Sequence, residues 1–160
     1  MEAIQISVLS VLAVIFIVYR QMRTRPTARP GILYVGGAMI ILGLITGGLI
    51  EPGQLALSIG LLVVEAAIAV GLGAWRATTV RVWLDASGVA WSKATGLTML
   101  AWVLSVAARA GLYFAGTALG LTPSTSGILL FAGLTVAAQS YLVARRGRAL
   151  TGTAGHRIPS

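Results

Sequence analysis

Long apolar runs separated by short polar segments make up most of this chain. Five such runs lie at about residues 3–19, 32–50, 55–74, 96–119 and 126–144. Each is close to the roughly 20 residues that a helix needs to cross the hydrocarbon core of a bilayer. The pattern therefore predicts an all-α integral membrane protein, in which five transmembrane helices form a single bundle over residues 1–144.

The polar segment between the third and fourth runs has a different period. Within residues 79–93, Val82 and Leu84 alternate with Arg81, Trp83 and Asp85, the turn sequence DASG begins at Asp85, and the alternation resumes at Val89 and Trp91. Such alternation predicts strands, and DASG is typical of turns. We expect a small cytoplasmic β-hairpin that pairs Leu84 with Val89 and Val82 with Trp91. Because an isolated hairpin is marginal in water, it should lie against the bundle or the bilayer surface.

The composition agrees with a membrane protein and excludes several kinds of chemistry. The chain has 160 residues, of which 57% are hydrophobic and only 10% charged, whereas a soluble domain carries roughly 25% charged residues. Cysteine is absent and His156 is the single histidine, so disulfides, thiolate metal sites, a thiol redox centre and a bis-histidine haem site within one chain are excluded. We expect no cofactor and no metal.

The basic residues indicate how the chain crosses the membrane. With five spans, eleven of the twelve basic residues fall on one side, and the other side carries only Glu2 and Glu51. The positive-inside rule then places the N-terminus outside and the C-terminus in the cytoplasm. The net charge of +8 is thereby explained without nucleic acid, and anionic lipid headgroups at the cytoplasmic face are the expected partners. Residues 145–160 are predicted to form a basic, disordered cytoplasmic tail.

Two charged residues, Glu65 and Arg109, lie near the middles of the third and fourth spans. A charge at that depth is expensive and needs a partner or a function. At 1.5 Å per residue their depths differ by roughly 5 Å, which a long arginine side chain can cover. Since the two spans are consecutive and antiparallel, we expect an ion pair.

Further polar residues extend this site along the fourth and fifth spans at helical spacing. The predicted ligand-binding candidates are Ser105, Arg109, Tyr113, Thr135, Gln139 and Glu65. Three interpretations are open: an ion pair that fixes helix register, a binding site for the polar end of a lipophilic or anionic ligand, and a catalytic or proton-coupled site. In the last case Glu65 and Arg109 are the catalytic candidates, because a buried carboxylate can act as acid or base.

Glycines occur at GxxxG spacing in two spans, as Gly43 with Gly47 and as Gly116 with Gly120. Small residues at this spacing let helix backbones approach closely in lipid. The motif is explained either by packing within the chain or by a homodimer formed through the second span.

Residues 78–112, TTVRVWLDASGVAWSKATGLTMLAWVLSVAARAGL, resemble the CcdC-like family of small five-span bacterial membrane proteins, named for cytochrome c biogenesis operons. The resemblance implies a bacterial cytoplasmic (inner) membrane protein and a place in membrane-protein or cytochrome maturation. The function we expect is a non-catalytic accessory or scaffold protein with a membrane-protein partner or a second copy. The alternative is an intramembrane enzyme or small carrier that acts on a lipophilic or anionic ligand at Glu65 and Arg109.

Overall fold

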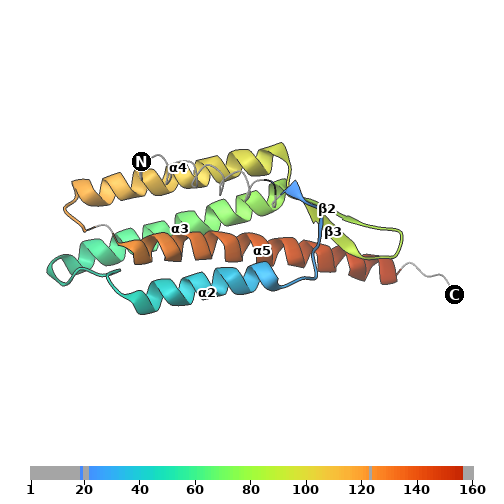
Figure 1. The fold of residues 1–160 in the computed structure, drawn as a ribbon, viewed down its shortest axis with the longest axis horizontal. Helices are drawn as coiled ribbons and strands as arrows, with labels where there is room; N and C mark the ends of the chain where they lie inside the picture. Colours follow the sequence, from blue (N-terminus) through green and yellow to red (C-terminus); the bar gives the residue numbers. More distant parts are fainter. Residues whose placement is uncertain (1–18, 20–21, 123, 157–160) are drawn as a thin grey trace, which may run out of the picture.

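The computed structural model of the chain describes residue 19, residues 22–122 and residues 124–156 (Figure 1). The first predicted span, about residues 3–19, lies outside these residues except for Tyr19. In chain order the elements are β1 (Arg25–Pro26), α2 (Gly31–Thr46), the short 3₁₀ helix η1 (Pro52–Gln54), α3 (Leu55–Thr79), β2 (Arg81–Leu84), β3 (Ala90–Lys93), α4 (Gly96–Ala118) and α5 (Thr125–Gly155).

Three of these helices are long and apolar enough to cross a membrane. They are the continuous helical segment of η1 and α3, the helix α4 and the helix α5. The described part of the chain is therefore mostly helical, with three candidate membrane-spanning helices. The fourth, α2, is apolar but has only 16 residues, a length of about 24 Å. It ends at Thr46 because Gly47 and Gly48 have positive φ angles of 78° and 76°, which continue no helix. The predicted span to residue 50 is therefore too long, and five spans are not confirmed.

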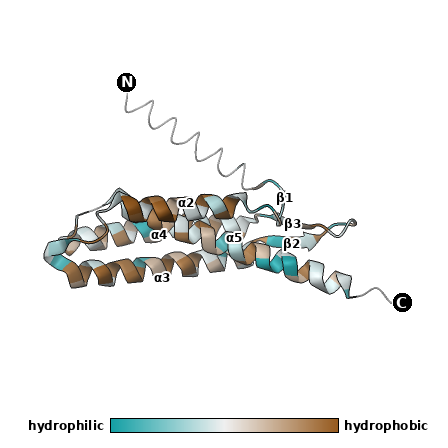
Figure 2. Cartoon of the chain, turned by 90° about the horizontal axis from the view of Figure 1, so that it is seen from below, coloured by the Kyte–Doolittle hydropathy of each residue, from teal (hydrophilic) through white to brown (hydrophobic). Residues whose placement is uncertain are grey.

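The helices run back and forth in a bundle in which α5 is central (Figure 1). α5 packs between α2 and α3, and α4 packs against α3. One end of the bundle, which we call the sheet end, carries β1, β2 and β3. The other end, the loop end, carries the connections at residues 47–54 and 119–122. Figure 2 shows hydrophobic residues along the helices and hydrophilic residues where α5 continues past the sheet end.

Glycines bring α5 into close contact with its two neighbours. A Cβ atom at Gly36 of α2 would lie 2.9 Å from the backbone nitrogen of Ala137, and one at Gly73 of α3 would lie 2.5 Å from the carbonyl oxygen of Thr135. Gly43 likewise faces α5, whereas Gly47 is outside the helix. These contacts support packing within the chain as the role of the second-span glycines, because close backbone approach favours helix association in lipid.

The predicted hairpin is present, but its register is shifted by one residue. β2 and β3 pair Trp83 with Trp91 and Leu84 with Ala90, not Leu84 with Val89. The Asp85 carboxylate accepts hydrogen bonds from the backbone nitrogens of Ser87 and Val89, both at 2.9 Å, and the backbone nitrogen of Asp85 donates to the carbonyl oxygen of Val89 at 3.0 Å. Asp85 and not Leu84 therefore lies opposite Val89, and the two tryptophans lie opposite each other.

A third strand, which the sequence did not predict, completes the sheet. β1 pairs antiparallel with β3, which places Arg25 beside Ser92 and Pro26 beside Trp91. The strand order is β1-β3-β2. The segment before α2 is thereby fixed to the sheet end.

The predicted disordered tail is wrong for residues 145–155, which continue α5 to Gly155. Nη1 of Arg146 donates to the carbonyl oxygens of Ala77 and Val80 at the end of α3. Gly147 lies directly against Thr27. These contacts stabilise the polar part of α5 as a helix. The composition of the segment alone did not predict them. Residues 157–160 lie outside the described residues.

Candidate functional site

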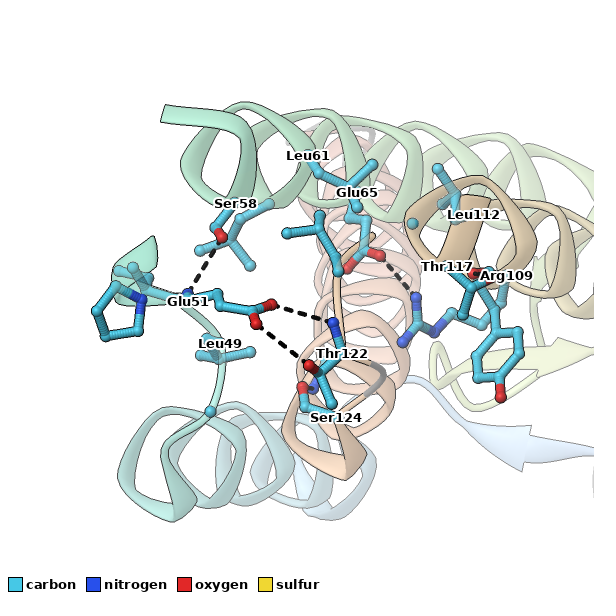
Figure 3. A pocket seen from close by; sticks show the side chains of 18 residues that line it. Leu49, Glu51, Ser58, Leu61, Glu65, Arg109, Leu112, Thr117, Thr122 and Ser124 are labelled. Carbon is cyan, nitrogen blue, oxygen red and sulfur yellow. Dashed lines mark hydrogen bonds and ion pairs between the residues drawn. The ribbon is translucent and has the colours of Figure 1, made fainter. Parts of the chain in front are cut away.

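The predicted ion pair between Glu65 and Arg109 is present. Nη1 of Arg109 on α4 lies 2.7 Å from Oε1 of Glu65 on α3, and the two side chains are 17% and 12% exposed (Figure 3). The near-equal depths on consecutive antiparallel helices bring the charges together, as the sequence indicated. Each charge is therefore compensated where solvation is poor.

A pocket of about 380 Å³ lies beside this pair. It is formed by α3, α4, the first turn of α5 and the two connections of the loop end (Figure 3). A volume of this size is sufficient for a small molecule. Its polar lining side chains include Glu51, Ser58, Glu65, Arg109, Tyr113, Thr117, Thr122 and Ser124, and leucines supply most of the rest.

Glu51 connects the two segments of the loop end by hydrogen bonds. Its carboxylate accepts hydrogen bonds from the backbone nitrogen of Thr122 at 3.1 Å and from the Thr122 hydroxyl at 3.3 Å. Its own backbone nitrogen donates to the hydroxyl of Ser58 at 3.1 Å. The contact ties the α2–α3 connection to the α4–α5 connection at the pocket (Figure 3). The sequence places Glu51 only on the outer side, because nothing in local spacing links it to Thr122.

The ion pair leaves part of the arginine without a partner. Nε of Arg109 is buried and has no hydrogen-bond acceptor among the described residues. The guanidinium has room because residue 127 of α5 is glycine: a Cβ atom there would lie 3.1 Å from Nη2 of Arg109. With Glu51, Glu65 and Arg109 in its lining, the pocket carries one more negative than positive charge.

Three of the six predicted ligand-binding candidates line the pocket, namely Glu65, Arg109 and Tyr113. The other three do not. The hydroxyl of Ser105 donates to Ala101 of its own helix. Thr135 donates to the carbonyl oxygen of Ala69 at 2.7 Å and links α5 to α3, and Gln139 is not among the lining residues. Two of the three candidates on α4, Arg109 and Tyr113, therefore line the pocket, whereas Thr135 of α5 contacts α3 instead.

The sequence groups Arg76 among the eleven basic residues on the cytoplasmic side of the five spans and predicts no burial for it, but its side chain lies buried in the bundle. Its side chain is 0% exposed, and its Cζ atom lies 3.8 Å from the centroid of the Trp102 ring. The cause is the length of α3, which continues to Thr79 and so carries Arg76 into the helix-packed region. Had the predicted third span been continued from residue 74 to the start of the predicted hairpin at residue 79, the sequence would have placed Arg76 within the helix.

Among the described residues, no group of three or more histidine, aspartate or glutamate side chains could hold a metal ion. No protein-family model matches this chain, and neither a curated protein nor a solved structure matches it. The resemblance to the CcdC-like family therefore stays a prediction.

Proposed function

We propose that this chain is a non-catalytic membrane protein that binds a small amphiphilic molecule in the pocket beside Glu65 and Arg109. The observation that supports this is the combination of a direct ion pair with open volume next to it. A pair that served only to fix helix register would be expected to be packed on all sides, because voids forfeit packing energy. Here Arg109 retains a buried donor and borders about 380 Å³.

The lining favours a ligand with a neutral polar or cationic head. A free anion would meet the carboxylates of Glu51 and Glu65, while the only cation of the lining already contacts Glu65. Tyr113 and the hydroxyls of Thr117 and Ser124 offer hydrogen bonds, and Leu61 and Leu112 offer an apolar wall. Such a division suits a molecule with a polar head and a short apolar body.

The proposal includes a placement in the membrane. The basic residues of β1, β2, β3 and the end of α5 gather at the sheet end, so by the positive-inside rule this end faces the cytoplasm of a bacterial cell. The pocket then opens toward the outer half of the cytoplasmic membrane. The CcdC-like resemblance adds that the ligand or a protein partner serves membrane-protein or cytochrome maturation.

A scaffold role without a ligand is the second candidate. The observation that favours it is the direct contact of Glu65 with Arg109 at 2.7 Å, which is complete without any bound molecule. In that case the pocket is a packing void at the loop end, and the sheet end carries the interaction with a partner.

Native mass spectrometry of the protein extracted together with its lipids separates these proposals. Thr117 lines the pocket on α4, so Thr117→Trp should fill it. Val106 on the same helix is 66% exposed and outside the lining, so Val106→Trp is a matched control for adding an indole.

We expect one bound species of defined mass on the wild-type chain and on Val106→Trp, and its loss in Thr117→Trp. A wild-type chain without such a species, or one retained by Thr117→Trp, would rule out the ligand-binding proposal in favour of the scaffold.

A further inference from the structure

Four buried nitrogen atoms at the sheet end have hydrogens to donate and no acceptor among the described residues. Three of them are Nε, Nη1 and Nη2 of Arg76, and the fourth is Nε1 of Trp102. Because the guanidinium lies over the indole ring at 3.8 Å, these donors form one cluster between α3 and α4. Buried polar groups normally have a partner, so the cluster requires an explanation.

Acceptors close to the cluster in sequence already accept other hydrogen bonds. Thr98 lies one turn before Trp102 and is 0% exposed. Its hydroxyl oxygen accepts a hydrogen bond from the Thr79 hydroxyl at 3.0 Å and one from the backbone nitrogen of Thr95 at 3.0 Å. The carbonyl oxygens of Ala77 and Val80 accept from Arg146. The neighbouring segments therefore bring a second cation, Arg146, to the end of α3, and among the described residues they offer no free acceptor to Arg76.

No described carboxylate forms an ion pair with Arg76. Glu65 lies three turns earlier on α3, about 16 Å away along the axis, and its described ion pair is with Arg109. Asp85 holds the turn of the sheet and accepts from the indole of Trp91 at 2.8 Å. Glu51 is at the loop end. Stacking on Trp102 offsets only part of the cost of burying the guanidinium, and a buried charge without compensation is strongly destabilising.

We propose that Arg76 and Trp102 form a binding site for a phosphate-type oxyanion. The guanidinium fork matches two oxygens of a phosphate, and the indole N–H supplies a further donor to a third oxygen or the same one. A water molecule would accept hydrogen bonds from this cluster but would leave its positive charge in place. The site is independent of the pocket at the loop end and shares no residue with it.

The position of the cluster indicates two sources for the oxyanion. Arg76 lies one turn before the end of α3, where the apolar helix gives way to the sheet, the level at which lipid headgroups meet a membrane-spanning helix. Trp102 is only half-buried, so its ring is the side from which the cluster can open. The shared chemistry is a phosphate group, carried either by a phospholipid or by free inorganic phosphate.

Thermal unfolding of the full chain, purified in detergent and stripped of lipid, tests the site. One series adds sodium phosphate against sodium chloride of equal ionic strength. A second series adds dihexanoyl phosphatidylglycerol against dihexanoylglycerol, which lacks the phosphate. Arg76→Lys keeps the charge without the fork, Trp102→Phe keeps the ring without the N–H, and Arg81→Gln on β2 is the control that removes one exposed basic residue from the same end.

We expect a saturable rise in Tm for the wild-type chain and for Arg81→Gln with a phosphate-bearing ligand. The midpoint concentration should rise about tenfold in Arg76→Lys, which loses a charge-assisted hydrogen bond, and several-fold in Trp102→Phe. A response to inorganic phosphate identifies the free ion, and a response to phosphatidylglycerol alone identifies the lipid headgroup.

The proposal is overturned if neither ligand gives a saturable shift in the wild-type chain. It is also overturned if Trp102→Phe and Arg76→Lys keep the wild-type midpoint. Should Arg76→Lys not fold, Trp102→Phe decides alone, because it preserves both the volume of an aromatic ring and the stacking.

Discussion

Two arginines among the described residues are stabilised in different ways, Arg109 near the middle of α4 and Arg76 near the sheet end of α3. Arg109 on α4 contacts Glu65 beside a pocket at the loop end. Arg76 on α3 is more deeply buried, yet it has only the face of Trp102 and no acceptor among the described residues. Arg109 thus has a carboxylate partner and borders a pocket, whereas Arg76 belongs to a cluster of hydrogen-bond donors without acceptors in the described part of the chain. The difference shows that burial alone does not reveal whether a charge has a partner.

Removing one member of the closed pair should give the largest effect. Glu65→Leu leaves Arg109 uncompensated and should lower the free energy of unfolding by about 3–5 kcal/mol. Glu65→Leu combined with Arg109→Leu should recover most of that loss, because replacing both members of a buried pair is often close to neutral. Equilibrium unfolding in detergent measures both variants.

A double variant as unstable as Glu65→Leu alone would show that Arg109 stabilises the fold by some contact other than this pair. If the double variant is stable but loses the bound species in mass spectrometry, the pair belongs to the ligand site.

The next largest effect concerns the helix contact beside Arg76. A Cβ atom at Gly73 would lie 2.5 Å from the Thr135 carbonyl oxygen, so Gly73→Ala should separate α3 from α5 and cost about 1–3 kcal/mol. Gly71→Ala, on the same helix with nothing within 4 Å, should be neutral or slightly stabilising. Thermal unfolding compares the two.

Separation at Gly73 should weaken phosphate binding at Arg76 and leave the species bound at the loop end in place. Equal loss at both ends would mean that the two sites are not independent.

A smaller effect is expected at Glu51. Glu51→Gln keeps the shape of the side chain but removes the charge and turns one acceptor toward Thr122 into a donor group, at a cost of about 0.5–1.5 kcal/mol. The loop-end pocket should lose ligand through faster release, while the Arg76 cluster should be unchanged. Hydrogen exchange at residues 119–122 measures the loosening, and unchanged protection there would refute the role of Glu51 as a tie.

The smallest effect is a pH dependence confined to the sheet. Hydrogen bonds from the Ser87 hydroxyl, the Trp91 indole and the Val89 backbone lower the pKa of Asp85 from 3.8 to about 2. Because the folded-state pKa is lowered, the stabilisation by Asp85 is fully present above about pH 4 and is lost as the pH falls through about 2. Tryptophan fluorescence measures this acid transition of the sheet, and Asp85→Asn should abolish it. A transition unchanged in Asp85→Asn would assign it to another group.

The sequence predicted those features that depend on spacing along one segment. Apolar runs predicted a membrane protein and located α3, α4 and α5 to within a few residues at most ends, because a helix must shield its own backbone in lipid. The depth of Glu65 and Arg109 along their spans predicted their contact. Alternation around DASG predicted the hairpin, although the carboxylate contacts of Asp85, and not the alternation, set its register.

Tertiary packing decided the rest. The pairing of β1 with β3, the tie between Glu51 and Thr122, and the burial of Arg76 under Trp102 each join segments far apart in the chain. Thr135 and Gln139 have the right spacing for the pocket, yet close approach at Gly73 turns this part of α5 toward α3. Helical period fixes which residues share a face, whereas the neighbour of that face is chosen by which backbones can approach, and that depends on both helices at once.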